Sequence, residues 1–248
     1  MRYLSLILTY ALLISCEPEG TRNDIPISYS IQEVLVTDPN CDQDQCFEVR
    51  LRYPVFEGDS VPATRANMFA NRTITEILGM GDVESTELSN LKKDAEILLD
   101  QYSGFKEEFP ESNQVWEVEV SMTHFYENDT LFSFGLKSFS YMGGAHPNSN
   151  RILFIFSKND GQIIRGDRLN SSYPALLEIA ERKFRETTEM KPGLSYSDAG
   201  FDFYENRFRL PANLSYTESG LELHYNKYEV APYAYGEINF MVPYSELK

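Results

Sequence analysis

The chain has 248 residues, of which 42% are hydrophobic and 13% aromatic, so it can bury the core of one large domain or two smaller ones. This composition excludes an intrinsically disordered protein, which would contain few aromatic and β-branched residues. The formal net charge of -16 repels nucleic acid phosphates and anionic lipid headgroups and attracts cationic partners. The same charge also serves simply to keep a protein soluble.

The first 26 residues are predicted to be a leader and a tether rather than part of a fold. Arg2 precedes an apolar stretch, Leu4 to Leu13, which has the length and layout of a secretory leader. Leu13-Ile-Ser-Cys16 resembles a bacterial lipobox, in which the cysteine is acylated and becomes the first mature residue. We therefore predict a lipoprotein signal peptide over residues 1–15 and a polar tether over residues 16–26. The expected location is the bacterial cell envelope, periplasmic or at the cell surface, although an ordinary signal peptide with an incidental cysteine is the alternative.

Two further cysteines, Cys41 and Cys46, enclose Asp-Gln-Asp-Gln. An even pair in an exported protein predicts a disulfide. A metal site is the alternative, but the chain has no second cysteine pair, and its three histidines are far apart in sequence. We expect no metal and no cofactor.

The chain after the tether begins with two predicted strands, Ile27 to Thr37 and Phe47 to Tyr53, the second alternating apolar and polar residues. Joined by the cysteine loop, they are expected to pair antiparallel. Pro62 to Leu78 changes to a helical period, and Gly79 is a stop signal. Its apolar face comprises Ala66, Phe69, Ala70, Thr73 and Ile77. A second helix follows, with an apolar stripe of Leu88, Leu91, Ala95, Leu98, Leu99 and Tyr102.

From Val115 the period returns to two. Trp116, Val118, Val120, Met122 and His124 share one side of a predicted strand. Asn128-Asp129 predicts a turn, and Leu131 to Tyr141 and Arg151 to Ser157 predict two more strands. Strands in succession after two helices indicate the α+β class.

A third helix is predicted after Ser171 or Ser172, with Pro174 in its first turn. Its expected buried side comprises Tyr173, Leu176, Leu177, Ala180 and Phe184. Further strands are predicted at Phe208 to Leu210, Leu221 to Tyr225 and Glu237 to Val242.

Two separated motifs carry a family resemblance. The first is Gly143-Gly-Ala-His146, and the second is Gly220-Leu-Glu-Leu-His-Tyr-Asn-Lys-Tyr228-Glu-Val-Ala-Pro-Tyr233-Ala-Tyr-Gly236, ending in Val242-Pro-Tyr-Ser-Glu-Leu247. Their order resembles bacterial extracytoplasmic proteins that pair a domain of unknown function numbered 4163, also called PdaC-type, with one numbered 3298. The extracellular part of the anti-sigma factor RsiV is similar in the same way.

The resemblance implies two packed lobes of antiparallel sheet with flanking helices, residues 27–150 forming the PdaC-type lobe and residues 151–248 the DUF3298 lobe. It also implies an envelope-exposed, non-catalytic module. The RsiV-like member recognises lysozyme, and other members lie beside peptidoglycan deacetylase domains. Neither the anti-sigma nor the deacetylase activity is expected to carry over, because we find no sigma-binding, transmembrane or deacetylase segment here.

The candidate ligand-binding residues are His146, Asn148, Tyr228, Tyr233 and Tyr235. A histidine in a Gly-Gly loop can act as a base, a metal ligand or a partner for a sugar hydroxyl, or it can simply bridge backbone groups. Tyrosines on a loop offer flat faces and hydroxyls to a carbohydrate or a protein, but they also pack. His124 and His224 are expected to be structural.

The sequence favours a binding module over an enzyme. It contains no Gly-x-Ser-x-Gly, His-Glu-x-x-His, P-loop or dinucleotide fingerprint, and no catalytic residue is assigned. The expected partners are the membrane, through the lipid anchor, and either cell-wall glycan or a basic lysozyme-like protein, with no nucleic acid. The alternatives are a peptidoglycan-modifying hydrolase that uses His146 and a structural subunit of an envelope complex.

Overall fold

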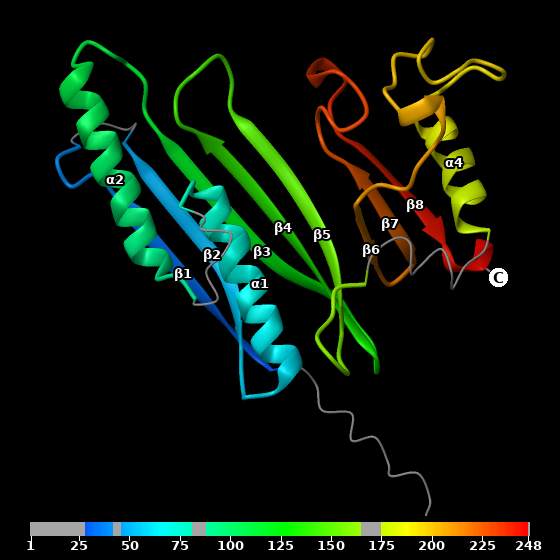
Figure 1. Cartoon of the computed structure of the whole chain (residues 1–248), viewed down its shortest axis with the longest axis horizontal. Helices are drawn as coiled ribbons and strands as arrows, with labels where there is room; N and C mark the ends of the chain where they lie inside the picture. The colour runs from blue at the N-terminus through cyan, green and yellow to red at the C-terminus, as the bar shows by residue number, and fades with distance from the viewer. Residues whose placement is uncertain (1–27, 42–45, 81–87, 165–174, 248) are drawn as a thin grey trace, which may run out of the picture.

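The computed structural model describes residues 28–41, 46–80, 88–164 and 175–247. These residues form two lobes, each a sheet with helices, side by side along the molecule (Figure 1). The α+β class is therefore confirmed. The predicted signal peptide, the Cys16 lipidation site, the tether and the capping positions Ser171, Ser172 and Pro174 lie outside the described residues.

The first lobe contains a five-stranded sheet in the order β1-β2-β3-β4-β5. Its strands are β1 (Tyr29–Thr37), β2 (Glu48–Phe56), β3 (Glu117–Glu127), β4 (Leu131–Tyr141) and β5 (Asn148–Ser157). The first two pair antiparallel, as predicted, and the Cys41–Cys46 disulfide between them is confirmed, with a Cα–Cα distance of 5.7 Å. The expectation of a purely antiparallel sheet is wrong at one place, because β2 and β3 pair parallel. Two helices connect these strands, and such a crossover returns the chain to the end from which it left.

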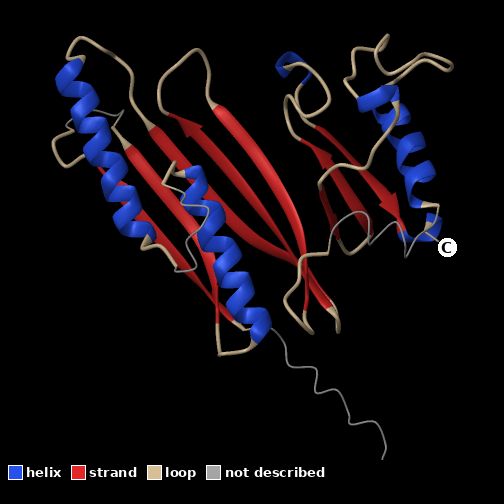
Figure 2. Ribbon diagram, viewed as in Figure 1, coloured by secondary structure: helices blue, strands red, loops and turns tan. Residues whose placement is uncertain are grey.

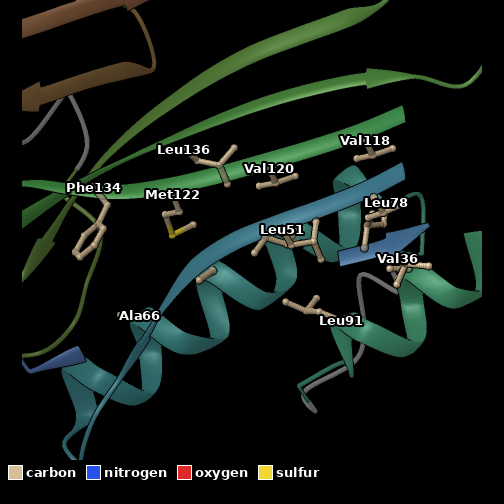
Figure 3. Packing of buried hydrophobic residues seen from close by; sticks show 14 of the residues in the cluster. Val36, Leu51, Ala66, Leu78, Leu91, Val118, Val120, Met122, Phe134 and Leu136 are labelled. Carbon is tan, nitrogen blue, oxygen red and sulfur yellow. The ribbon is translucent and has the colours of Figure 1, made fainter. Parts of the chain in front are cut away.

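Those helices, α1 (Val61–Ile77) and α2 (Leu91–Glu108), cover one face of the sheet (Figure 2). Alternate residues of β2, β3 and β4 meet the apolar sides of the helices there in a hydrophobic layer. Figure 3 shows side chains of the sheet, such as Leu51 and Met122, and of the helices, such as Ala66 and Leu91, gathered in this layer. Of the predicted stripe of α2, Leu91, Ala95, Leu98 and Tyr102 are buried and Leu99 is partly buried, whereas Leu88 precedes the helix and is exposed.

The second lobe contains a three-stranded antiparallel sheet, β6 (Asn213–Tyr216), β7 (Gly220–Tyr225) and β8 (Ile238–Pro243), packed against α4 (Leu176–Thr187). Short 3-10 turns, η1 (Tyr204–Asn206), η2 (Tyr233–Tyr235) and η3 (Tyr244–Glu246), complete it. Phe184 of α4 is fully buried among aromatic rings. Two predictions are wrong here. Leu177 shares a face of α4 with Phe184, but it is 40% exposed because it lies in the first turn of the helix, at the wall of an open cavity. Residues 208–210 form no strand, since they are followed at once by Pro211, which lacks an N–H for pairing.

The two lobes join along the free edge of β5. The side-chain amide of Asn226 accepts from the Arg151 N–H at 2.7 Å and donates to the Arg151 carbonyl at 2.8 Å. Asn213 accepts from the Leu153 N–H at 3.3 Å. Side-chain amides thus take the place of a sixth strand and satisfy an edge that would otherwise invite pairing with another chain. The predicted division between residues 150 and 151 falls within β5, whose whole length belongs to the first sheet.

Candidate functional site

The glycine-rich turn between β4 and β5 presents His146. Gly143 and Gly144 have φ of 93° and 103°, which side-chain-bearing residues rarely adopt. A Cβ at Gly143 would also lie 2.8 Å from Gln114 Oε1. The Tyr141 hydroxyl donates to the Gly144 carbonyl at 3.2 Å, and this bond links the end of β4 to the second glycine of the turn. The two glycines therefore allow a tight reversal that leaves His146 exposed at its tip.

The structure brings His146 together with Tyr228 and Tyr233 of the second lobe. The rings of His146 and Tyr233 are stacked, with centroids 4.6 Å apart and an interplanar angle of 21°. Tyr228 lies 5.4 Å from Tyr233 by ring centroid, and its hydroxyl lies 3.5 Å from His146 Nε2. We call these three residues the aromatic cluster. It lies at the junction of the two predicted domains, so neither lobe forms it alone.

A cation supports the aromatic cluster, and sequence reasoning missed it. Lys227 places its Nζ 4.8 Å from the centre of the Tyr233 ring and 3.0 Å from Ser149 Oγ. The first contact is a cation–π interaction, and the second is another link between the lobes. A lysine next to Tyr228 and within six residues of Tyr233 was the signal available in the sequence.

The backbone of this loop is anchored just before the aromatic cluster. Asn226, which bridges to Arg151, accepts from His224 Nε2 at 3.2 Å and donates its own N–H to Glu229 at 2.8 Å. Burial raises the pKa of the Glu229 carboxyl, while the N–H groups of Asn226 and Ala212 act in the opposite direction. The loop that carries Tyr228 and Tyr233 is thereby fixed to β5, which in turn follows the His146 turn.

Tyr228 is unusual within this loop because its φ is 67°, in the left-handed region, and its side chain is 63% exposed. A left-handed conformation costs a residue with a side chain roughly 1–2 kcal/mol, and glycine or asparagine ordinarily occupies it. An exposed tyrosine contributes little packing in return. Because Tyr228 is both strained and exposed, a role in binding explains why a tyrosine stands at this position.

The other candidate residues lie elsewhere. Asn148 is exposed at the first position of β5, opposite Ser140. Tyr235 packs edge-on against Phe201, with centroids 5.1 Å apart, and burial raises the pKa of its hydroxyl. His124 contacts the Tyr126 carbonyl at 2.9 Å. His224 is 1% exposed within the second lobe.

The chemistry that the aromatic cluster offers is recognition by flat rings, hydroxyls and one cation. Tyrosine faces match the apolar faces of a sugar ring, while Tyr228 and His146 can hydrogen-bond its hydroxyls. Within the residues that the structure describes, no group of three or more His, Cys, Asp or Glu side chains is arranged to hold a metal ion. No described helix combines the length and apolar character of a membrane span.

Two α+β lobes joined at a sheet edge, with exposed rings at the junction, define a two-domain protein. Residues 41–149 match the family model described as "Deacetylase PdaC", and residues 163–245 match the one described as "Protein of unknown function (DUF3298)". The chain therefore carries a PdaC-like domain followed by a DUF3298 domain. No curated protein sequence matches it.

Solved structures share this fold across both lobes. A DUF3298 family protein from Pseudomonas aeruginosa PAO1 aligns with a TM-score of 0.59 and 17% identity, covering 90% of this chain and 94% of that one. A DUF3298 family member from Bacteroides fragilis NCTC 9343 aligns with a TM-score of 0.62 and 15% identity, covering 88% and 92%. At such identities the likeness concerns the fold.

Proposed function

We propose that this protein is a non-catalytic binding module of the bacterial cell envelope and that its aromatic cluster contacts cell-wall glycan. The single observation that carries the proposal is Tyr228, an exposed ring held in a left-handed backbone conformation beside His146 and Tyr233. Aromatic platforms with hydroxyls and one cation suit amphipathic sugar rings that carry acidic peptide groups.

The location of the protein in the cell is also part of the proposal. A disulfide is typical of proteins that fold outside the cytoplasm, and the Cys41–Cys46 bond supports such a location. Lipidation of Cys16 would then tether the two lobes to the membrane through residues 16–26. Wild-type protein should partition with membranes and a Cys16→Ala variant should be released, whereas equal partition of the two would contradict the anchor.

The glycan proposal is tested by titration calorimetry of the purified protein with soluble peptidoglycan fragments. A Tyr228→Ala variant should bind at least tenfold more weakly, as expected for a central aromatic contact. Tyr204→Ala is the matched control, because Tyr204 is 65% exposed on the second lobe but lies outside the aromatic cluster. Wild-type protein that releases no heat, or a Tyr204→Ala variant as weak as Tyr228→Ala, would reject the proposal. Turnover of the fragments that His146→Ala abolishes would instead favour the hydrolase alternative.

A second candidate partner is a basic, lysozyme-like envelope protein. The net charge of -16 favours it, since a field of that sign steers cationic proteins toward the surface. Binding of this kind should weaken steeply between low and physiological salt, because exposed charges are screened over about 8 Å at 0.15 M ionic strength. Salt-insensitive binding would remove the electrostatic argument. A subunit of a larger assembly would instead co-purify with its partners from membranes.

A further inference from the structure

An open cavity of about 620 Å³ lies at the outer edge of β5, between the two lobes. Phe69 of α1, Phe154 of β5 and Leu177 of α4 contribute to its apolar wall. It shares no lining residue with the aromatic cluster. Ligand pockets commonly have volumes of about 300–1,000 Å³ and lie where domains meet.

The segment between η1 and β6 forms one wall of this cavity, and it is held in place from behind. The hydroxyl of Tyr225, a buried residue of the second lobe, donates to the Arg209 carbonyl. The Ala212 N–H faces the Glu229 carboxyl and lowers its pKa, against the effect of burial. These two contacts make the wall part of the folded second lobe.

The polar groups on the cavity wall are donors. Asn213 lines the wall and its Oδ1 accepts from the Leu153 N–H, so its Nδ2 group is the end of the amide that can donate to a ligand. Arg209 is exposed, and its guanidinium is held over the Tyr204 ring at 4.7 Å. No Asp or Glu is found among the described lining residues. A ligand with an anionic head would therefore meet one cation and one amide donor at this wall, and hydrogen bonds to a charged group are the stronger kind.

The exposed side chain of Leu177 at the mouth of the cavity indicates that a ligand would also have an apolar part. Leu177 is 40% exposed although it belongs to an amphipathic helix whose other leucine, Leu176, is fully buried. The cavity volume of about 620 Å³ is that of an ordinary ligand pocket and leaves room for an apolar chain beside Leu177.

We propose that this cavity binds a single-chain amphiphile with a carboxylate head, such as a fatty acid. The chain lies against Phe69, Phe154 and Leu177. The carboxylate accepts from Arg209 and Asn213. This site is separate from the aromatic cluster, so it stands whether or not the protein binds glycan.

The test is titration calorimetry of the purified protein with dodecanoate below its micelle concentration, and with dodecanol. Dodecanoate should bind saturably at one site. Leu177→Glu should lower its affinity at least tenfold, because a carboxylate at the mouth repels the head and removes apolar surface. Arg209→Ala should lower dodecanoate affinity about tenfold and leave dodecanol affinity unchanged, since only the charged head loses a charge-assisted hydrogen bond.

Leu35→Glu is the matched control, because Leu35 is 57% exposed on β1 in the first lobe and does not line the cavity. It should bind dodecanoate as wild type does. Wild-type protein without saturable binding would overturn the proposal. So would a Leu35→Glu variant as impaired as Leu177→Glu, or an Arg209→Ala variant that binds both probes as wild type does.

Discussion

The guanidinium of Arg151 in β5 meets the carboxylate of Glu222 in β7 through two hydrogen bonds, one of them 3.0 Å long from Nη2 to Oε2. The side chains are 22% and 12% exposed, so the pair is largely withdrawn from water where the two lobes join. Asn239 donates to the same carboxylate at 2.9 Å. This relationship explains how two small sheets stay together, since it adds a charged link to the amide contacts along β5.

Removing one partner of this pair should destabilise the protein. Glu222→Ala leaves the Arg151 charge half-buried without its partner, and we expect the free energy of unfolding to fall by about 3 kcal/mol. Urea denaturation measures this fall. The Lys92–Glu96 pair, with a 3.9 Å contact and side chains 69% and 53% exposed, is the control. Glu96→Ala should change stability by less than about 1 kcal/mol, and equal effects of the two substitutions would contradict the assignment.

Stability should fall as the pH drops, because of His224. Burial is the largest influence on this imidazole, and it lowers the pKa. The positive charge of Arg151 lowers the pKa further. The hydrogen bond to Asn226 and the carboxylates of Glu237 and Glu222 raise the pKa, but they do not outweigh burial. The unfolded chain, with an ordinary histidine pKa of about 6.5, therefore binds more protons than the folded one. The contribution of neutral His224 is present above about pH 6.5 and is lost as the pH falls through the lower folded pKa.

Urea denaturation between pH 8 and pH 5 measures this dependence. His224→Phe should be less stable at pH 8, because the bond to Asn226 is lost, but its stability should fall less steeply between pH 7 and pH 5. A variant with the same slope as wild type would show that other groups control the acid response.

The Cys41–Cys46 bond closes a short loop beside the first strand pair. On the loop-entropy account, closing so few residues stabilises a fold by about 2 kcal/mol. Replacing both cysteines by serine should lower the urea midpoint accordingly. Reductant should lower the midpoint of the wild type to the same value and leave the variant unchanged. A wild type that does not respond to reductant under unfolding conditions would contradict this contribution.

The local periodicity of the sequence predicts individual strands better than it predicts which strands pair with each other. Leu131 to Tyr141 was predicted to be a strand and forms β4 with the same bounds, because the Asn128-Asp129 turn signal marks its start and the run contains several aromatic residues. The parallel pairing of β2 with β3 was missed, since alternation describes the faces of a strand and not its neighbours. β6 was missed as well, because Asn213–Tyr216 is only four residues long.

The candidate site shows the same limit. His146 and Tyr228 were singled out by their turn chemistry and exposed rings, but they are 82 residues apart in the chain. Their proximity depends on Asn226 docking against β5, a contact between two lobes that no sequence pattern encodes. Tyr235 looked equivalent to Tyr233 in the sequence, yet η2 turns its ring toward Phe201.

Substitutions of Tyr228 can separate its contribution to glycan binding from its contribution to the stability of the fold. In Tyr228→Gly the backbone keeps its φ of 67° without strain, so the melting temperature should stay equal or rise, the gain being at most about 1 kcal/mol. Tyr228→Val should lower it, because a β-branched side chain tolerates this conformation poorly. Both variants lack the ring and should lose glycan binding to the same extent. Thermal unfolding and calorimetry on the three proteins decide the matter, because a Tyr228→Gly variant that melts earlier than wild type would mean that the tyrosine is retained for the fold.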